Sequence, residues 1–350
     1  MDTEWIYFDA VTGYDKGELN HAAQILRQGG LVAFPTETVY GLGGDGFNPQ
    51  AAKKIYEAKG RPSDNPLILH ISKREELDAI AARIPETAEK LMDAFWPGPM
   101  TLIFEKTKAV PYETTGGLDT VAVRMPSHEG ARQLIESAGV PVAAPSANTS
   151  GRPSPTTAEH VKEDLWGRID MIIDGGLVGI GVESTIIDVT EETPTILRPG
   201  HITKNMIAKV IGTVQMDAGL SGLDQSVKPK APGMKYRHYA PKASMTVIQG
   251  KKEAVIRRIE ELAAEYPKEK VGILAADETL SCYTHGQVVS AGSRNEHTIE
   301  QGLYRALREF DHMGVSVIFF ESFADDDRSE AIMNRLLKAA GQKIEYLSDK

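Results

Sequence analysis

Apolar positions in the first two hundred residues alternate between helical spacing and short continuous runs. Between Leu19 and Leu26 they recur every three or four residues, which predicts a helix, and Gly29 and Gly30 follow as a stop signal. Leu31–Phe34 is then a run typical of a buried strand. The same criteria predict helices at Ala51–Ala58, Glu75–Ala82 and Ala88–Phe95. They predict strands at Trp5–Phe8, Leu67–Ile71, Met100–Phe104, Val121–Arg124, Val140–Ala144, Met171–Asp174, Thr185–Val189 and Thr195–Leu197.

The predicted strands outnumber the predicted helices, and several strands follow one another with no predicted helix between them. A sheet made only of parallel strands needs a crossover connection between successive strands. We therefore expect residues 1–211 to form a mixed, twisted sheet with helices, rather than a simple alternating parallel sheet.

The composition changes between residues 212 and 241, where glycine, serine, proline and lysine dominate in the manner of a linker. Beyond it, strands and helices alternate, which predicts a small Rossmann-like, doubly wound α/β domain at 242–350. The predicted strands there are Thr246–Ile248, Val271–Ala275 and Val315–Phe320, and the predicted helices are Ala254–Glu265, Ile299–Phe310 and Ala331–Ala340.

The overall composition narrows the class of protein. The 350 residues are 41% hydrophobic and 25% charged, which is ordinary for a globular protein. A net charge of −10 lowers the expectation of a protein that grips nucleic acid by its phosphates. One cysteine, Cys282, excludes an intramolecular disulfide and a Cys-x-x-Cys zinc site. The apolar runs are too short to span a bilayer and the N-terminus is acidic, so we expect a cytoplasmic protein without membrane contact.

A turn rich in hydroxyl groups follows the strand Leu31–Phe34 and includes Thr36. Ligands of open α/β sheets bind at strand ends, although a plain turn with local hydroxyl bonds explains Thr36 equally well. Gly41, Gly43 and Gly46 match the pattern G-x-G-x-x-G. No helix opens within the motif, so we do not expect a dinucleotide fingerprint.

Two cations, Lys59 and Arg61, flank Gly60 between a predicted helix and a predicted strand. The point charge of lysine and the planar fork of arginine suit neighbouring phosphate oxygens. A helix C-terminus also favours a cation, which would explain Lys59 without any ligand. It explains less well why Arg61 is followed by prolines that stiffen the loop.

Further cations and hydroxyl groups lie at the ends of predicted elements. Arg124 ends a buried strand, where a cation needs an anionic partner, either a substrate carboxylate or an internal salt bridge. His70 lies in an apolar strand, where the alternative is a hydrogen-bonded core histidine. These residues lack a Ser–His–Asp, paired-carboxylate or metal-ligand pattern, so they favour binding and orienting anionic substrates. The other members of the group are Ser146, Asn148, Ser184 and Arg198.

At these residues the chain resembles the YrdC-type L-threonylcarbamoyladenylate synthases, in their longer, two-domain form. The resemblance covers nearly the whole chain. The motifs that carry it are Pro-Thr-Glu-Thr-Val-Tyr-Gly-Leu at 35–42, Lys-Gly-Arg-Pro at 59–62, Pro-Leu-Ile-Leu-His at 66–70, Phe-Trp-Pro-Gly-Pro-Met-Thr at 95–101, Arg-Met-Pro at 124–126, Pro-Ser-Ala-Asn at 145–148 and Pro-Gly-Met-Lys-Tyr-Arg-His-Tyr-Ala-Pro at 232–241.

The resemblance implies a nucleotidyltransferase that acts in tRNA processing. It would join L-threonine, bicarbonate and ATP into L-threonylcarbamoyl-AMP with release of pyrophosphate. A downstream transferase would then modify the tRNA adenosine beside the anticodon, and direct tRNA contact by this chain is expected to be weak. ATP would bring Mg²⁺, held mainly by its phosphates and not by protein side chains.

Matching motif positions imply the roles of individual residues. Arg124 would pair the carboxylate of threonine, and Lys59 and Arg61 would be the catalytic cations. The threonine site would comprise Thr36, His70, Arg124, Ala144 through its backbone, and Ser184. The ATP site would comprise Lys59, Arg61, Asn65, Thr120, Ser146, Asn148, Ser154, Arg198 and Tyr239, with His238 as a rival to Tyr239.

Two alternatives remain open at this point. The chain could be an RNA-binding module with a nucleotide-binding cleft, although its acidic total charge argues against this. The linker at 212–241 is aromatic and basic near its end, so we expect it to fold over the active site as a lid; a linker packed permanently between two domains is the alternative.

Overall fold

The structure is a computed structural model that describes residues 2–221, 231–232, 238–294, 298–322 and 329–347. The chain divides into two compact units. The first comprises Met1–Ser150, Ser154–Gly179 and Glu183–Tyr236, and the second comprises Gly151–Pro153, Ile180–Val182 and Arg237–Lys350. Residues 222–230 and 233–237 of the predicted linker lie outside the described residues, so its closure over the active site stays a prediction, as do the predicted domain limits.

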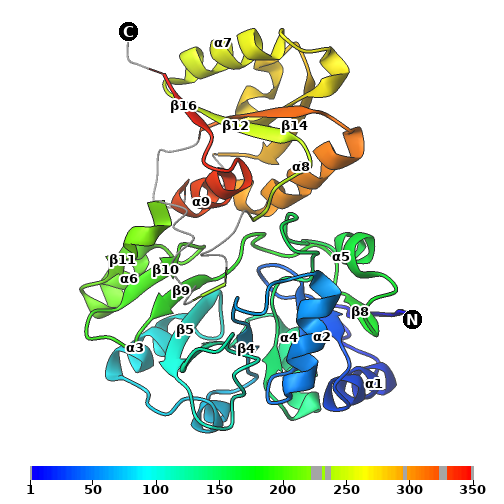
Figure 1. Cartoon of the computed structure of the whole chain (residues 1–350), viewed down its shortest axis with the longest axis vertical. Coiled ribbons are helices and arrows are strands. Elements are labelled where there is room, and N and C mark those ends of the chain that lie inside the picture. The colour runs from blue at the N-terminus through cyan, green and yellow to red at the C-terminus, as the bar shows by residue number, and fades with distance from the viewer. Residues whose placement is uncertain (1, 222–230, 233–237, 295–297, 323–328, 348–350) are drawn as a thin grey trace. The chain divides into compact units, whose positions relative to one another are not determined.

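The first unit contains one large mixed sheet (Figure 1), as predicted, with the strand order β1-β8-β2-β3-β7-β4-β6-β5-β9-β10-β11. Five neighbouring pairs are parallel and five are antiparallel. The strands are β1 (Glu4–Tyr7), β2 (Val32–Phe34), β3 (Gly41–Asp45), β4 (Ile68–His70), β5 (Met100–Glu105), β6 (Thr120–Arg124), β7 (Val142–Ala143), β8 (Met171–Asp174), β9 (Thr185–Asp188), β10 (Thr195–Arg198) and β11 (Gln215–Met216).

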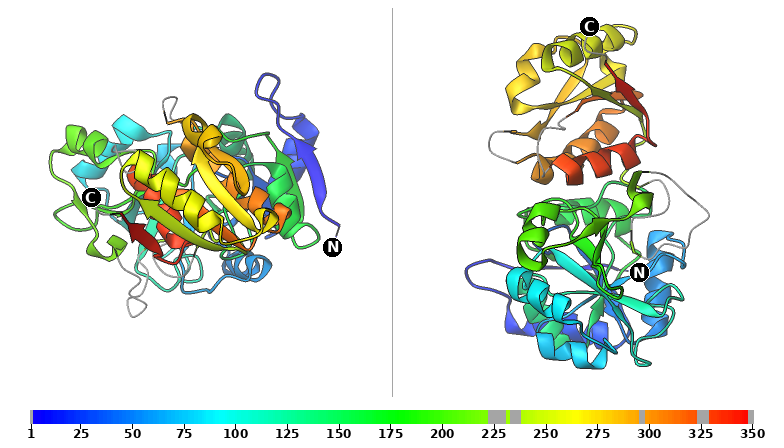
Figure 2. Two further views of the ribbon diagram at one scale, coloured as in Figure 1. Left: turned by 90° about the horizontal axis from the view of Figure 1, so that it is seen from above. Right: turned by 90° about the vertical axis from the view of Figure 1, so that its left-hand side faces the viewer.

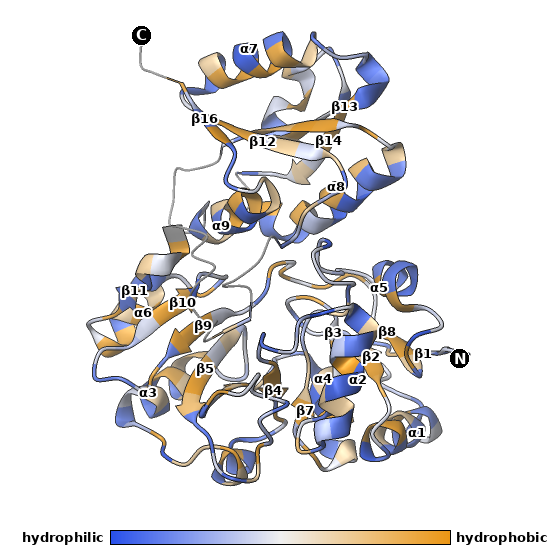
Figure 3. Cartoon of the chain, viewed as in Figure 1, coloured by the Kyte–Doolittle hydropathy of each residue, from blue (hydrophilic) through white to orange (hydrophobic). Residues whose placement is uncertain are grey.

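Alternation along β2 explains why its sequence is continuously apolar. Val32 and Phe34 pack into one hydrophobic cluster, whereas Leu31 and Ala33 pack into another. Successive side chains of a strand point to opposite faces of its sheet, so β2 is buried on both sides. Figure 3 shows β2 coloured as a hydrophobic segment.

Helices cover both faces of this sheet with their apolar stripes. The cluster around Val32 and Phe34 includes α1 (Lys16–Arg27) and α4 (Glu129–Ala138). The cluster around Leu31 and Ala33 includes α2 (Pro49–Lys59), α3 (Glu86–Phe95), α5 (Ala158–Leu165) and α6 (Lys204–Ile211). The short 3₁₀ helices are η1 (Arg74–Ala79) and η2 (Ala218–Ser221).

Two segments differ from the sequence-based expectation. Residues 75–82 were expected to be an α-helix, but the chain forms the 3₁₀ helix η1 and then bends at Ile80. Gly41–Asp45, for which no strand was predicted, is strand β3. Its glycines allow close packing, because a Cβ atom on Gly43 would lie 2.8 Å from Val142 Cγ1 and 2.9 Å from Phe34 Cε1. The helices α4, α5 and α6 and the strands β11, β14 and β16 were not predicted.

The second unit is a Rossmann-like α/β domain, as predicted. Its five strands are all parallel, in the order β14-β13-β15-β12-β16, and helices lie on both faces of the sheet (Figure 2). The strands are β12 (Ser244–Gln249), β13 (Val271–Ala276), β14 (Gln287–Gly292), β15 (Val317–Glu321) and β16 (Ile344–Tyr346). The helices are α7 (Lys252–Ala263), α8 (Ile299–Met313) and α9 (Ser329–Ala339), with the 3₁₀ helices η3 (Lys268–Lys270) and η4 (Asp277–Cys282).

Candidate active site

Two of the residues predicted to bind L-threonine lie side by side where β4 and β6 end. His70 is the last residue of β4, and it is the cross-strand partner of Arg124, the last residue of β6. On its other side Arg124 is paired with Thr101 of β5. Three strands therefore present an imidazole, a guanidinium and a hydroxyl group side by side.

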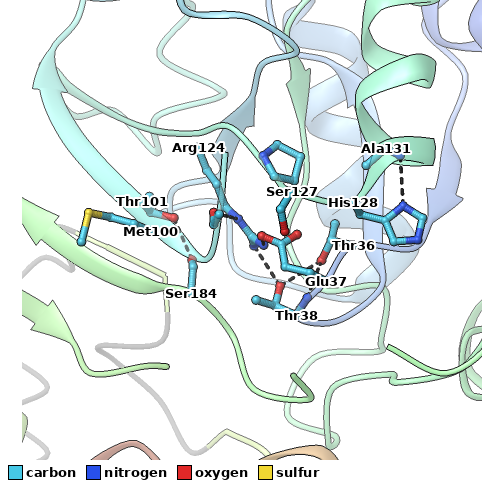
Figure 4. Close-up of polar contacts among 12 residues, drawn as sticks. Thr36, Glu37, Thr38, Met100, Thr101, Arg124, Ser127, His128, Ala131 and Ser184 are labelled. Atoms are coloured by element: carbon cyan, nitrogen blue, oxygen red, sulfur yellow. Dashed lines mark hydrogen bonds and ion pairs between the residues drawn. The ribbon is translucent and has the colours of Figure 1, made fainter. Parts of the chain in front are cut away.

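Arg124 is buried, with 4% of its surface exposed, and its charge is matched by a carboxylate. Its Nη2 lies 2.7 Å from Oε1 of Glu37, and its Nη1 donates a hydrogen bond to Thr38 Oγ1 at 2.9 Å. Its Nε donates to the carbonyl of Gly98 at 3.3 Å. Figure 4 shows the two charged side chains pointing toward each other. The internal salt bridge considered for Arg124 is thus present in this structure.

Glu37 keeps its charge in this environment. Burial raises the pKa of its carboxyl, but the Arg124 guanidinium and the backbone N–H of Ser127 outweigh burial, so the pKa lies below its ordinary value. Its side chain is 12% exposed. The site therefore holds a buried pair of opposite charges.

Thr36 organises the turn that carries Glu37. Its hydroxyl donates to the carbonyl of Val39 at 2.6 Å and lies 2.9 Å from the Thr38 hydroxyl. The backbone N–H groups of Thr38 and Val39 donate back to the same oxygen at 3.2 and 3.3 Å. The local hydroxyl bonds considered as an alternative are therefore real, and through Thr38 they connect Thr36 with Arg124.

His70 is neutral in the folded protein. It is 4% exposed, and burial lowers its pKa to about 3, with a further contribution from the charge of Arg124. Its Nδ1 lies 3.2 Å from the carbonyl of Ile68. A neutral imidazole can orient a substrate by hydrogen bonding without adding a charge to the site.

This neutral state predicts a pH-dependent stability. The unfolded chain binds a proton at His70 below the ordinary histidine pKa of 6.5, and the folded protein does so only near 3, so the free energy of unfolding should fall as the pH is lowered between those values. Between about pH 6 and pH 5 this group's share should approach about 1.4 kcal/mol per pH unit. Urea unfolding at several pH values should show that the free energy of unfolding of His70→Gln depends correspondingly less on pH than that of the parent. Equal slopes in the variant and the parent would contradict a neutral His70.

A series of hydrogen bonds, here called the hydroxyl chain, joins residues predicted to bind threonine with residues predicted to bind ATP. Ser184 Oγ lies 2.7 Å from Thr101 Oγ1 and accepts a hydrogen bond from Nη2 of Arg198 at 3.1 Å. The Nε of Arg198 donates to the Ser184 carbonyl at 3.0 Å. Arg198 is 4% exposed and ends β10, so these contacts run from Thr101 of β5, through Ser184 just before β9, to the end of β10. Arg124, the predicted partner of the threonine carboxylate, is the cross-strand neighbour of Thr101 in this chain of contacts.

Lys59 connects α2 to the predicted Ser146–Asn148 loop. The helix ends at Lys59 because Gly60 adopts a left-handed conformation with φ of 60°, which also turns the chain toward Arg61. The buried Nζ of Lys59 donates hydrogen bonds to the carbonyls of Ser146 and Asn148. The Ser146 hydroxyl donates to Asn148 Oδ1 at 2.5 Å. The two separate sequence motifs are therefore one structural feature.

The loop after Arg61 contains an unusual buried amide. Nη2 of Arg61 donates to the carbonyl of Pro66 at 3.1 Å, while the side chain of Asn65 is 1% exposed. Neither Nδ2 nor Oδ1 of Asn65 has a hydrogen-bond partner among the described residues. Buried polar groups are nearly always hydrogen-bonded, so this amide has unused hydrogen-bonding capacity, and its contact with ATP stays a prediction.

The remaining predicted residues are more dispersed. Thr120 begins β6 at the opposite end from Arg124, and the backbone N–H of Ala144 donates to Ile68 at 2.9 Å within the sheet. The Ser154 hydroxyl donates to Glu183 Oε1 at 2.5 Å. Tyr239 belongs to the second unit, where its ring stacks on Tyr304 with centroids 5.3 Å apart, and its contact with ATP stays a prediction.

Sequence reasoning did not single out Glu37, Thr38 or Thr101. All three lie inside quoted motifs, and the signal for Glu37 and Thr38 was their place beside Thr36, but nothing in the sequence pairs Glu37 or Thr38 with Arg124, which is 86 positions from Thr38. Within the described ranges, no three carboxylate, imidazole or thiol groups gather into a set that could hold a metal ion. No helix of the described part is long and apolar enough to cross a membrane.

Fold and site together describe an α/β protein in which buried cations and hydroxyl groups lie at strand ends, an arrangement that suits the binding of small anionic substrates. Comparison with known proteins narrows the class. Residues 24–200 match the family model described as Telomere recombination (Sua5, YciO and YrdC), and residues 202–341 match the model described as Threonylcarbamoyl-AMP synthase, C-terminal domain.

Individual relatives agree over nearly the full length. A threonylcarbamoyl-AMP synthase of Pyrococcus abyssi is 50% identical over 94% of this chain and 96% of the relative, and one of Bacillus subtilis is 51% identical over 93% and 94%. The crystal structure of P. abyssi Sua5 complexed with L-threonine is 48% identical, with a TM-score of 0.93, and covers 99% of this chain and 100% of that one. The chain belongs to the Sua5-type threonylcarbamoyl-AMP synthase family.

Proposed function

We propose that this enzyme makes L-threonylcarbamoyl-AMP from L-threonine, bicarbonate and ATP, with release of pyrophosphate and water. ATP enters as its magnesium complex. The product would pass to a transferase that modifies the tRNA adenosine beside the anticodon. The observation that carries the proposal is the set of hydrogen bonds from Thr101 through Ser184 to Arg198. In it Ser184, which we predict to bind threonine, contacts Arg198, which we predict to bind ATP.

The reaction needs positioning more than a protein nucleophile. The amine of threonine attacks bicarbonate, or its dehydrated form, to give a carbamate. A carbamate oxygen then attacks the α-phosphorus in line, and pyrophosphate leaves. Such a step is accelerated by holding the two reactants in contact and by cations at the developing charge. A continuous set of polar contacts between the two predicted subsites suits this requirement.

The division of roles follows the predicted sites. Arg124 would bind the carboxylate of threonine, with His70 and the hydroxyl groups of Thr36 and Ser184 around it. Lys59 and Arg61 would stabilise charge at the α-phosphate and the leaving pyrophosphate. The orphaned amide of Asn65 would complete its hydrogen bonds with the nucleotide.

An assay with each substrate omitted in turn tests the proposal. Pyrophosphate release should require both threonine and bicarbonate, and mass spectrometry should detect the threonylcarbamoyl adenylate. Serine should react poorly, because a pocket that fits the methyl group of threonine loses roughly 1–3 kcal/mol when that group is missing. Equal pyrophosphate release without any amino acid would contradict the proposal.

A further inference from the structure

The predicted threonine site lacks a partner for one of the two charges of its ligand. A free amino acid is a zwitterion, with a carboxylate and an ammonium group joined through a single carbon atom. Thr36, His70, Arg124, Ala144 and Ser184 offer one cation and no anion. His70 is neutral, and Thr36, Ala144 and Ser184 are uncharged, so within this set no carboxylate balances the ammonium group.

Glu37 supplies a carboxylate at this place. It directly follows Thr36 in the turn, and its Oε1 lies 2.7 Å from Nη2 of Arg124. A ligand that pairs its charges with both side chains would carry a negative and a positive group close together. The charged groups of an α-amino acid satisfy this condition, because only the α-carbon separates them.

The carboxylate of Glu37 also has unused capacity to accept hydrogen bonds. Both oxygens are buried; Oε1 is in ion-pair contact with Arg124, and the backbone N–H groups of Ser127 and Glu37 also act on the carboxylate, although neither oxygen accepts a well-aligned hydrogen bond from the described residues. A carboxylate offers about four acceptor positions, so positions remain for further donors, and a buried acceptor position without a donor is costly. Three N–H donors of an ammonium group would fill such positions.

We propose that Glu37 binds the ammonium group of L-threonine while Arg124 binds its carboxylate, so that the two residues form one receptor for the zwitterion. This inference rests on the proposed function and adds a substrate-binding residue to it. The turn held by Thr36 fixes Glu37 at this position through its bonds to residues 38 and 39.

An alternative role for Glu37 predicts the opposite effect on the affinity for threonine. The residue could occupy Arg124 in place of the substrate carboxylate, and threonine would then have to displace it. Removing a competitor strengthens binding, whereas removing an ammonium partner weakens it. Affinity measurements on a neutral variant therefore distinguish the two roles.

The test uses isothermal titration calorimetry on the full chain with two ligands. L-Threonine carries both charges, and (R)-3-hydroxybutanoate keeps its carboxylate and hydroxyl group but lacks the amine. For Glu37→Gln we expect the Kd of threonine to rise about tenfold or more, because a charge-assisted hydrogen bond is lost. The Kd of the amine-free ligand should change less than about threefold, since its contacts do not include Glu37.

Two further variants keep the result interpretable. Glu37→Asp retains the charge on a shorter side chain and should show a smaller loss than Glu37→Gln. Asp93→Asn, whose carboxylate pairs with Arg74 at 2.6 Å on the exposed face of α3, is the matched control and should bind both ligands as the parent does. If Glu37→Gln fails to fold, Glu37→Asp and the preference of the parent for threonine over its amine-free analogue decide the question.

Several results would overturn the inference. Tighter binding of threonine to Glu37→Gln would identify Glu37 as a competitor for Arg124. Equal losses for both ligands would show that Glu37 only holds Arg124 in place, as would parent affinities that do not depend on the amine. Failure of the parent chain to bind threonine at all would instead contradict the proposed function, without reference to Glu37.

Discussion

Replacement of Arg124 by methionine should lower the free energy of unfolding by roughly 3–5 kcal/mol, because it removes one partner of a buried ion pair. Glu37 would remain as a largely buried carboxylate that has lost its contact at 2.7 Å. The hydroxyl of Thr38 and the carbonyl of Gly98 would also lose a donor. Urea denaturation at neutral pH measures the change.

A double variant separates the cost of an orphaned charge from the cost of lost packing. Arg124→Met combined with Glu37→Met removes both charges, and replacing a buried pair by apolar residues is often neutral or stabilising. The double variant should therefore recover most of the stability that the single variant loses, while threonine-dependent activity stays absent. A double variant as unstable as Arg124→Met would show that the pair does not dominate the stability of this site.

The second large effect is expected from the two cations that flank Gly60. Lys59→Ala and Arg61→Ala should each lower kcat on the order of a hundredfold or more, because removing one charge-stabilising contact from a transition state typically has that cost. Initial rates of pyrophosphate release at saturating substrates give the comparison. Lys53→Ala is the matched control, since Lys53 lies on the same helix and its Nζ forms an exposed pair at 3.8 Å from Glu113.

The structure distinguishes the two cations in their effect on stability. The Nζ of Lys59 is hydrogen-bonded to the carbonyls of Ser146 and Asn148, so Lys59→Ala should also destabilise the protein by roughly 1–3 kcal/mol. Arg61 is less buried, and the melting temperature should change little when it is replaced. Full activity in both variants would contradict a catalytic role, and Lys59 would then only hold the Ser146–Asn148 loop while Arg61 would be a cation in a loop.

Local signals in the sequence were sufficient for elements whose pattern and burial agree. The helix around Leu26, the strand Leu31–Phe34 and the strands β12, β13 and β15 of the C-terminal domain follow from spacing and apolar runs, and the structure confirms them. The same holds for the places where chemistry was expected, because a cation or hydroxyl group at the end of an apolar run is visible in one sequence. Arg124 and Arg198 do end their strands.

Strand β3 shows where local signals fail. Three glycines in five residues argue against a strand, since glycine has a low β-propensity. The neighbouring side chains Val142 and Phe34 leave no space for a Cβ at Gly43, so close packing in the sheet decides its conformation. Val142 lies 99 residues further along the chain, so the local sequence around Gly43 does not report this contact.

The sequence by itself determined which residue types are available and at which strand ends they lie. Only the tertiary structure decided which of them meet. Arg124 pairs with Glu37, Lys59 holds the carbonyls of Ser146 and Asn148, and Ser184 touches Arg198 because the mixed sheet brings distant strand ends together. The physical reason is that a charge or hydroxyl group is satisfied by its neighbours in space, and the mixed pairing of parallel and antiparallel strands sets those neighbours.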